Sequence, residues 1–144
     1  PGGQRPRRWR DRCAAGVGLF LDVAAKMLGL PLEEAGHLSL TSSIDLSLSS
    51  SCVVFAQSEV VSLVHVGNRI ADVMHAVNKA AAFKASSLAR RMGIEPDVAL
   101  LGGVANNPGF VACLREGTGC EILIPGEPQV VGALGAALIA QSGE

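Results

Sequence analysis

Apolar residues recur every three or four positions in three segments of the chain, which predicts three helices. These segments cover residues 14–28, 55–66 and 69–91, and Gly93 stands where the third helix needs a left-handed residue to end it. Residues 37–52 are rich in serine and partly alternate between apolar and polar, so we expect an extended segment or a weak strand there. In the longest helix, the positions expected to be buried are Ile70, Val73, Met74, Val77, Ala81, Phe83 and Leu88.

The second half of the chain alternates between short apolar runs and helical patterns. The runs "DVALLGG" at 97–103 and "EILIP" at 121–125 are typical of short buried strands. Between them, "NNPGFVACLREG" at 106–117 predicts a turn and a helix with Pro108 near its first turn. The run "PQVVGALGAALIAQ" at 128–141 predicts a closing helix whose small residues favour close packing. This order of strand, helix, strand and helix predicts an α/β layer.

The composition fits one domain, or one lobe of a larger protein, with a core of small aliphatic side chains. Of the 144 residues, 49% are apolar but only 3% are aromatic, and 17 are glycine. A net charge of −1 gives no reason to expect binding to nucleic acid or to a membrane. No apolar run reaches the roughly 20 residues that a membrane span needs. Four cysteines are too few for a disulfide scaffold, so we expect a cytoplasmic location, with Cys113 and Cys120 as structural residues.

Residues 1–12 are predicted to form an irregular, basic N-terminal segment. Five of the twelve basic residues of the chain lie there, which is consistent with a solvated end or with an arm that binds an acidic partner. The segment starts with Pro1, Gly2 and Gly3 and has no initiator Met, so we expect the chain to be a fragment.

The stretch "LLGGVANNPG" places two glycines directly after a predicted strand and just before a predicted helix. Gly102 and Gly103 carry no Cβ, so the backbone there can come close to a ligand. The start of the following helix offers free N–H groups and the positive end of a helix dipole, which favour an anionic or nucleotide ligand. When the stretch is taken alone, two glycines after a strand more often form a plain tight turn.

Two cysteines stand at the mouths of predicted helices. Cys13 lies in "RCAAGVG" at residues 12–18, and Cys52 lies in "SSSCVVFAQSEVV" at residues 49–61. Neither has a second cysteine nearby in the sequence, so each taken alone is interpreted as an ordinary buried residue.

Three features of the second half together resemble the C-terminal adenosine-binding segment of actin-like ATPases. They are the strand followed by "GGVANNPG", the second strand followed by "PGEPQ", and the final "GALGAALIA". More narrowly, they resemble the ATPase activators of (R)-2-hydroxyacyl-CoA dehydratases and the ATPase subunits of benzoyl-CoA reductase. The resemblance implies an α/β fold, the C-terminal lobe of an actin-like (ribonuclease H-like) ATPase, over residues 13–144. It also implies a pocket for ATP or ADP with Mg²⁺, formed by Gly102, Gly103, Val104, Asn106 and Gln129.

The same family carries one cysteine in a "KCAAGTG" segment and another in an "SSxCxVFAxSEV" segment. The resemblance therefore implies that Cys13 and Cys52 bind a [4Fe–4S] cluster. Such a cluster normally takes four thiolates, and a homodimer with the cluster on its twofold axis would supply them. The implied function is an ATP-driven donor of a low-potential electron to a partner protein, either a dehydratase or a reductase.

The chain departs from this family in its first residues. The family has an N-terminal half with its own phosphate loop, and that half is absent from this sequence. Arg5 also stands where a second phosphate segment would have Asp, and Val17 replaces a Thr. We therefore expect no ATPase activity from this chain alone. Two alternatives stay open: a nucleotide-binding lobe without a cluster, and an inactive interaction module.

Overall fold

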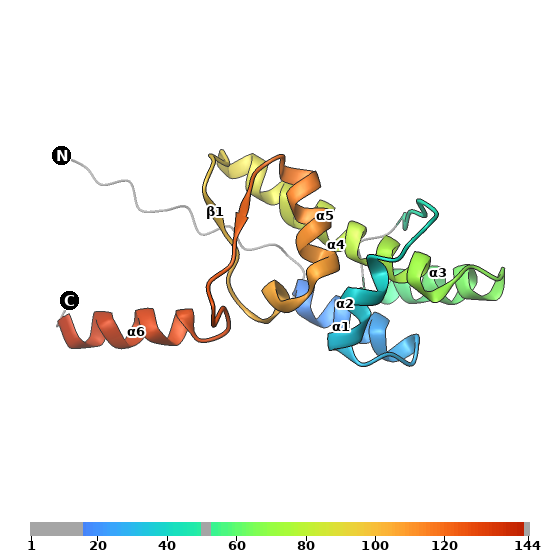
Figure 1. The fold of residues 1–144 in the computed structure, drawn as a ribbon, viewed down its shortest axis with the longest axis horizontal. Helices are drawn as coiled ribbons and strands as arrows, with labels where there is room; N and C mark the ends of the chain where they lie inside the picture. Colours follow the sequence, from blue (N-terminus) through green and yellow to red (C-terminus); the bar gives the residue numbers. More distant parts are fainter. Residues whose placement is uncertain (1–15, 50–52, 143–144) are drawn as a thin grey trace.

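The computed structural model describes residues 16–49 and 53–142 of the chain. Six α-helices, one 3-10 turn and two short strands occupy these residues (Figure 1). In chain order they are α1 (Val17–Met27), α2 (Leu32–Ser39), α3 (Val53–His65), α4 (Ile70–Met92), β1 (Val98–Ala99), η1 (Gly103–Asn106), α5 (Pro108–Thr118), β2 (Ile122–Leu123) and α6 (Val131–Ser142).

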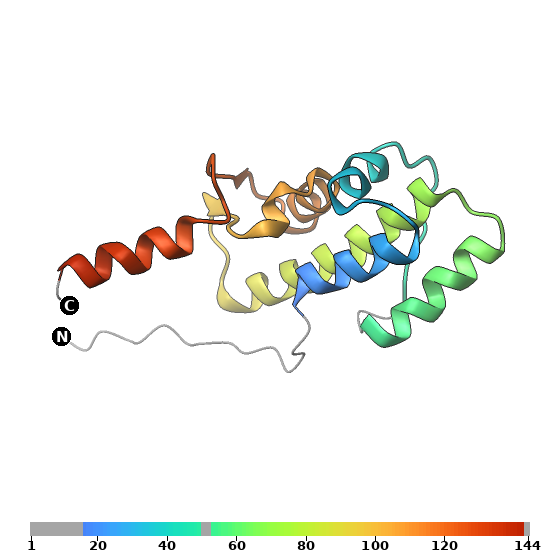
Figure 2. The same ribbon diagram turned by 90° about the horizontal axis from the view of Figure 1, so that it is seen from below.

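The long helix α4 is the centre of the fold. It contacts α1, α2, α3 and α5, and Figure 2 shows α1 running beside it. The core around it is built mainly of Ala, Val and Leu with two phenylalanines, as the composition predicts. Gly93 ends α4 in the left-handed conformation, with φ of 80°.

Most positions predicted to be buried in α4 are confirmed, but Phe83 is not. Val73, Met74 and Val77 are fully buried, whereas Phe83 is 71% exposed. A helix turns by about 100° per residue, so nine positions place Phe83 on the opposite side from Met74. The core covers only one side of α4, and Phe83 therefore faces away from it. Ile70, in the first turn, is also exposed.

The predicted strand, helix and strand order is confirmed by the β1, α5 and β2 unit. The two strands are parallel, with Val98 opposite Ile122 and Ala99 opposite Leu123. They are less buried than predicted, because Ile122 is buried but Ala99 and Leu123 are exposed. A two-stranded sheet leaves one edge of each strand without a neighbour, which explains this exposure.

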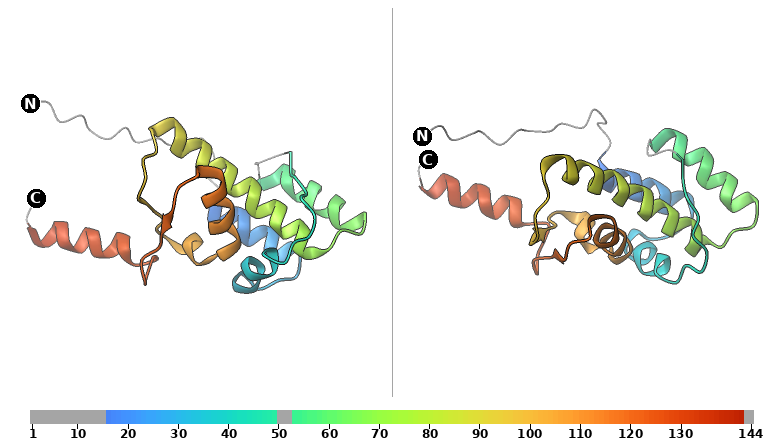
Figure 3. Two further views of the ribbon diagram at one scale, coloured as in Figure 1. Left: turned by 45° about the horizontal axis from the view of Figure 1, so that its top comes forward. Right: turned by 90° about the horizontal axis from the view of Figure 1, so that it is seen from above.

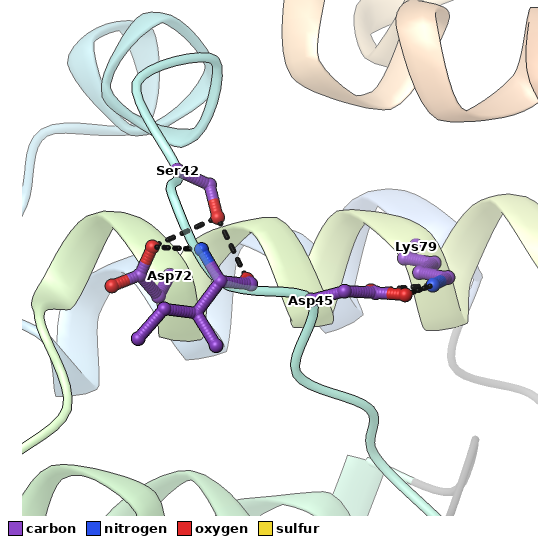
Figure 4. Close-up of polar contacts among 5 residues, drawn as sticks. Ser42, Asp45, Asp72 and Lys79 are labelled. Carbon is purple, nitrogen blue, oxygen red and sulfur yellow. Dashed lines mark hydrogen bonds and ion pairs between the residues drawn. The ribbon is translucent and has the colours of Figure 1, made fainter.

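The serine-rich segment is not a strand. Its first residues belong to α2, which continues to Ser39, and residues 42–49 form a loop without regular structure. Figure 4 shows how this loop is tied to α4. The Oδ1 atom of Asp72 accepts hydrogen bonds from Ser42 Oγ at 2.9 Å and from the backbone N–H of Ser43 at 2.7 Å. Nearby, Lys79 forms an exposed ion pair with Asp45.

The closing helix α6 is not closely packed. None of its residues is buried, and Figures 1 and 3 show it extending away from the other helices. Its apolar side chains meet no other described element that could bury them, and Leu134, Leu138 and Ile139 are each more than half exposed. Among residues 16–49 and 53–142, no helix has both the length and the apolar character needed to cross a membrane.

Candidate functional site

The turn after β1 leads into η1, whose residues line a cavity. Gly102 has φ of 93°, a conformation that side chains other than glycine rarely adopt. Its N–H donates a hydrogen bond to the carbonyl of Pro128 at 2.8 Å, which ties this turn to the loop before α6. Gly103 then starts η1, and Asn107 ends it. This hydrogen bond brings Gly103 and Gln129, the residues that follow Gly102 and Pro128, to the same cavity.

A cavity of about 400 Å³ lies at this point, between η1, α1, α2 and the loop before α6. Its volume is within the range of small-molecule sites. The residues that line it are Gly18, Leu21, Leu32, Glu33, Gly103, Val104, Asn106, Asn107 and Gln129.

Four of the five residues predicted for a nucleotide pocket line this one cavity. They are Gly103, Val104, Asn106 and Gln129; Gly102 precedes them in the chain but does not line the cavity. A Cβ atom added at Gly103 would lie 3.3 Å from Gln129 Nε2, so the backbone here passes close to the Gln129 side chain. A side chain at position 103 would therefore meet Gln129, whereas glycine leaves this part of the backbone open.

Sequence reasoning missed the walls that α1 and α2 contribute. Gly18 and Leu21 come from α1, and Leu32 and Glu33 come from α2. Among the described lining residues, Glu33 is the one with a charged side chain, and its carboxylate can accept hydrogen bonds from hydroxyl or amine groups. Helical spacing predicts α1 but not the element that it faces, so the sequence alone carries no signal for these contacts.

Asn107 both lines the cavity and caps α5. Its Oδ1 accepts a hydrogen bond from the N–H of Phe110 at 2.9 Å, and Pro108 follows at the first helical position, as predicted. The backbone N–H of Asn107 donates to the carbonyl of Val104 at 3.0 Å, which closes η1. The same residue thus ends one wall of the cavity and starts the helix behind it.

Cys13 and Cys52, the two predicted cluster ligands, lie outside the described residues. The helices that follow them are described: α1 begins at Val17, and α3 begins at Val53, directly after Cys52. Neither helix has an acidic residue in its first turn. Among residues 16–49 and 53–142, no group of three or more His, Cys, Asp or Glu side chains is placed to hold a metal ion.

Glu59 supports the segment that leads to Cys52. It is half-buried, and its two carboxylate oxygens accept hydrogen bonds from the N–H and the hydroxyl of Ser49, at 2.7 and 2.6 Å. Glu59 does not line the cavity. Its carboxylate therefore joins α3 to the end of the loop that Asp72 holds on α4.

The other two cysteines are free thiols of different character. Cys113 on α5 is buried, whereas Cys120 is half-buried. Burial raises the pKa of the Cys113 thiol to about 11, so this thiol stays protonated at neutral pH. A protonated, buried thiol suits a structural residue better than a metal ligand.

Comparison with known proteins gives consistent matches along nearly the whole chain. A family model described as the BadF/BadG/BcrA/BcrD ATPase family matches residues 4–140. The 2-hydroxyisocaproyl-CoA dehydratase activator of Clostridioides difficile is 43% identical over 130 residues, which are 90% of this chain and 49% of that protein. The (R)-2-hydroxyglutaryl-CoA dehydratase activating ATPase of Acidaminococcus fermentans is 42% identical, over 90% of this chain and 50% of that protein.

A solved structure supports the same match in three dimensions. The activator of the 2-hydroxyisocaproyl-CoA dehydratase from Clostridium difficile, solved with bound ADPNP, superposes with a TM-score of 0.87 at 42% identity. The superposition covers 93% of this chain and 50% of that one. The chain thus spans about half the length of the relatives that it matches.

Proposed function

Because the chain belongs to the BadF/BadG/BcrA/BcrD ATPase family, we propose that it is the nucleotide-binding lobe of an iron–sulfur activator driven by ATP. The predicted fold, the C-terminal lobe of an actin-like ATPase, is confirmed by the match to the solved activator. We propose that two copies share one [4Fe–4S] cluster and pass a low-potential electron to a partner protein. That partner is a 2-hydroxyacyl-CoA dehydratase or a benzoyl-CoA reductase.

The cavity beside η1 is the observation that carries the nucleotide part of this proposal. Gly103 leaves room for the ligand to reach the backbone, and the amides of Asn106 and Gln129 can each donate and accept hydrogen bonds at the edges of a base or a sugar. Glu33 repels phosphate groups but can accept from sugar hydroxyls. ATP or ADP would therefore place its adenosine in the cavity and its phosphates away from Glu33. We assign the groups that hold Mg²⁺ and the terminal phosphate to a second lobe. The relatives are about twice as long as this chain and have room for such a lobe.

The cluster part of the proposal rests on the sequence segments around Cys13 and Cys52 and on the helices that follow them. The start of a helix carries a partial positive charge, which lowers the pKa of a nearby thiol and stabilises its thiolate. The first turns of α1 and α3 add no carboxylate that would oppose this effect. Two chains would supply the four thiolates that such a cluster needs. When bound, the cluster supplies the one-electron carrier.

Helix α1 supports a connection between the two sites. Gly18 and Leu21 line the cavity, and Cys13 precedes the same helix by a few residues. A ligand in the cavity touches α1 within its first two turns. A change of nucleotide would therefore act on the helix that follows a cluster ligand, which fits a gate that releases the electron in one nucleotide state.

Anaerobic reconstitution with iron and sulfide tests the proposal. We expect about four iron atoms and four sulfides per dimer, together with visible absorption of the cluster. The double variant Cys13→Ser, Cys52→Ser should lose the iron, whereas Cys113→Ser and Cys120→Ser should retain it. Iron content in the parent chain no higher than in the double variant would exclude the cluster. If the parent chain then binds ADP but no iron, a nucleotide-binding lobe without a cluster is favoured. If it binds neither ADP nor iron, an interaction module is favoured.

A further inference from the structure

Three buried polar side chains form a continuous chain of hydrogen bonds through the core beside the cavity. Ser39 on α2 is 1% exposed, Asn78 on α4 is 0% exposed and Asn107 at the start of α5 is 7% exposed. Asn107 Nδ2 donates to Asn78 Oδ1 at 3.2 Å, Asn78 Nδ2 donates to Ser39 Oγ at 2.8 Å, and Ser39 Oγ donates to the Gly36 carbonyl at 2.7 Å. We call Ser39, Asn78 and Asn107 the polar relay.

The members of the relay satisfy one another's hydrogen-bonding groups inside a mainly apolar core. A buried amide without partners is costly, so a core position normally holds an apolar side chain unless the amide is satisfied. Asn78 uses its oxygen and its nitrogen on two different helices, α5 and α2. One side chain on α4 therefore fixes the relative position of both.

Two glycines make the space that the relay occupies. A Cβ atom at Gly109 would overlap Ser39 Oγ and would lie 2.6 Å from Asn78 Nδ2. A Cβ atom at Gly36 would lie 2.5 Å from Asn107 Oδ1. Helices α2 and α5 thus approach each other closely at the relay, and a larger residue at either glycine would clash with it.

The residue that caps α5 and the first residues of α2 both line the cavity. Asn107 lines it directly and closes η1, which contributes Gly103, Val104 and Asn106, while α2 contributes Leu32 and Glu33 on the other side. Asn78 itself does not line the cavity. Its two hydrogen bonds nevertheless join it to Asn107, which lines the cavity, and to Ser39 on α2, the helix that contributes Leu32 and Glu33.

We propose that Asn78 is a positioning residue for the cavity, which holds α2 and the η1–α5 junction at the spacing that an adenine nucleotide requires. This inference rests on the proposed nucleotide function of the cavity. Asn78 acts on the ligand only through Asn107 and Ser39. Its removal leaves the buried Nδ2 of Asn107 without the acceptor that it has here and takes from Ser39 Oγ the hydrogen bond that it accepts, while Ser39 still donates to the Gly36 carbonyl.

The experiment compares three variants of the 144-residue chain. Asn78→Leu removes both hydrogen bonds at similar side-chain size, and Asn78→Asp retains an acceptor for Asn107. Val73→Ala is the matched control, because Val73 is equally buried on α4 but takes no part in the relay. Thermal unfolding shows whether the variants are folded and how far each is destabilised.

Amide hydrogen exchange is the first readout, because it needs no ligand. In Asn78→Leu we expect faster exchange at the N–H groups of Asn107 and Phe110, while Val73→Ala leaves them protected. ADP calorimetry is the second readout. Asn78→Leu should weaken binding by roughly fivefold or more, the effect of about one lost hydrogen bond, and Asn78→Asp should weaken it less.

The two readouts separate the possible failures. If the parent chain does not bind ADP, the proposed function fails, and hydrogen exchange still tests the positioning role. If Asn78→Leu and Val73→Ala show the same local exchange at these amides, Asn78 is an ordinary core residue and the inference is wrong. The same conclusion follows if ADP affinity is unchanged in a folded Asn78→Leu variant whose parent binds ADP.

Discussion

Gly109→Ala should destabilise this chain strongly, although the same substitution at the open position Gly132 should be harmless. The added Cβ would overlap Ser39 Oγ and would lie 2.6 Å from Asn78 Nδ2 and 2.8 Å from the Gly36 carbonyl oxygen. A buried backbone atom cannot move away as the end of a flexible side chain can. The substitution must therefore push α5 from α2 or break the polar relay.

The size of the effect follows from three terms. Overpacking in a core costs about 1–3 kcal/mol. Two strained or broken hydrogen bonds of the relay cost roughly 1 kcal/mol each. Alanine regains up to about 1 kcal/mol over glycine in a helix. The expected net loss in the free energy of unfolding is therefore about 2–4 kcal/mol.

Urea unfolding followed by circular dichroism measures this loss, with Gly132→Ala as the matched control. A Cβ atom at Gly132 in α6 meets no other atom within 4 Å, so that variant should be neutral or slightly more stable. Equal unfolding midpoints for Gly109→Ala and Gly132→Ala would refute the close contact of α2, α4 and α5 on which the cavity depends.

Two further predictions concern the loop held by Asp72 and the chemistry of the isolated chain. Hydrogen bonds from the Ser43 N–H, and then from Ser42 and Ile44, hold the pKa of Asp72 below its usual value against the opposing effect of burial. This carboxylate therefore adds stability above the unfolded-state pKa of about 3.9 and loses it as the pH falls through the lower folded value. Asp72→Asn should lower the urea midpoint of unfolding at pH 7, and should lower it much less at pH 3. A difference in midpoint between the parent chain and the variant that is the same at both pH values would contradict this. Separately, a phosphate-release assay on the 144-residue chain should show no steady turnover of ATP, because phosphoryl transfer needs groups that hold Mg²⁺ and the terminal phosphate; turnover abolished by Gly103→Val would overturn that expectation.

Local patterns of the sequence predict the helices and strands of this fold well, because they depend on neighbours in the chain. The helical spacing of Val73, Met74 and Val77 identifies the buried face of α4, and Gly93 and Pro108 mark helix ends. The prediction for Phe83 is wrong because, nine positions after Met74, it lies on the opposite side of the helix from the buried residues. The predicted close packing of α6 is also wrong, since small apolar residues show that a helix can pack closely but not which element covers it.

The candidate site could be predicted only where the motifs of the family resemblance include its residues. Gly103, Val104 and Asn106 lie close together in one motif, and the structure gathers them with Gln129 around one cavity. Glu33 and Gly18 join this cavity through contacts between distant parts of the chain, which no local pattern encodes. Asn78 was unremarkable in the sequence because its role depends on two partners, 39 and 29 residues away.

The variant Gly103→Val decides best whether the cavity beside η1 binds an adenine nucleotide. Gly103 is exposed and its φ is not positive, so the variant should remain folded, while its side chain occupies the space between the backbone and Gln129. We predict that isothermal calorimetry detects ADP binding to the parent chain and to Gly132→Ala, and at least roughly tenfold weaker binding to Gly103→Val, a difference of about 1.4 kcal/mol. Equal ADP affinity in a folded Gly103→Val variant would show that the nucleotide does not bind in this cavity.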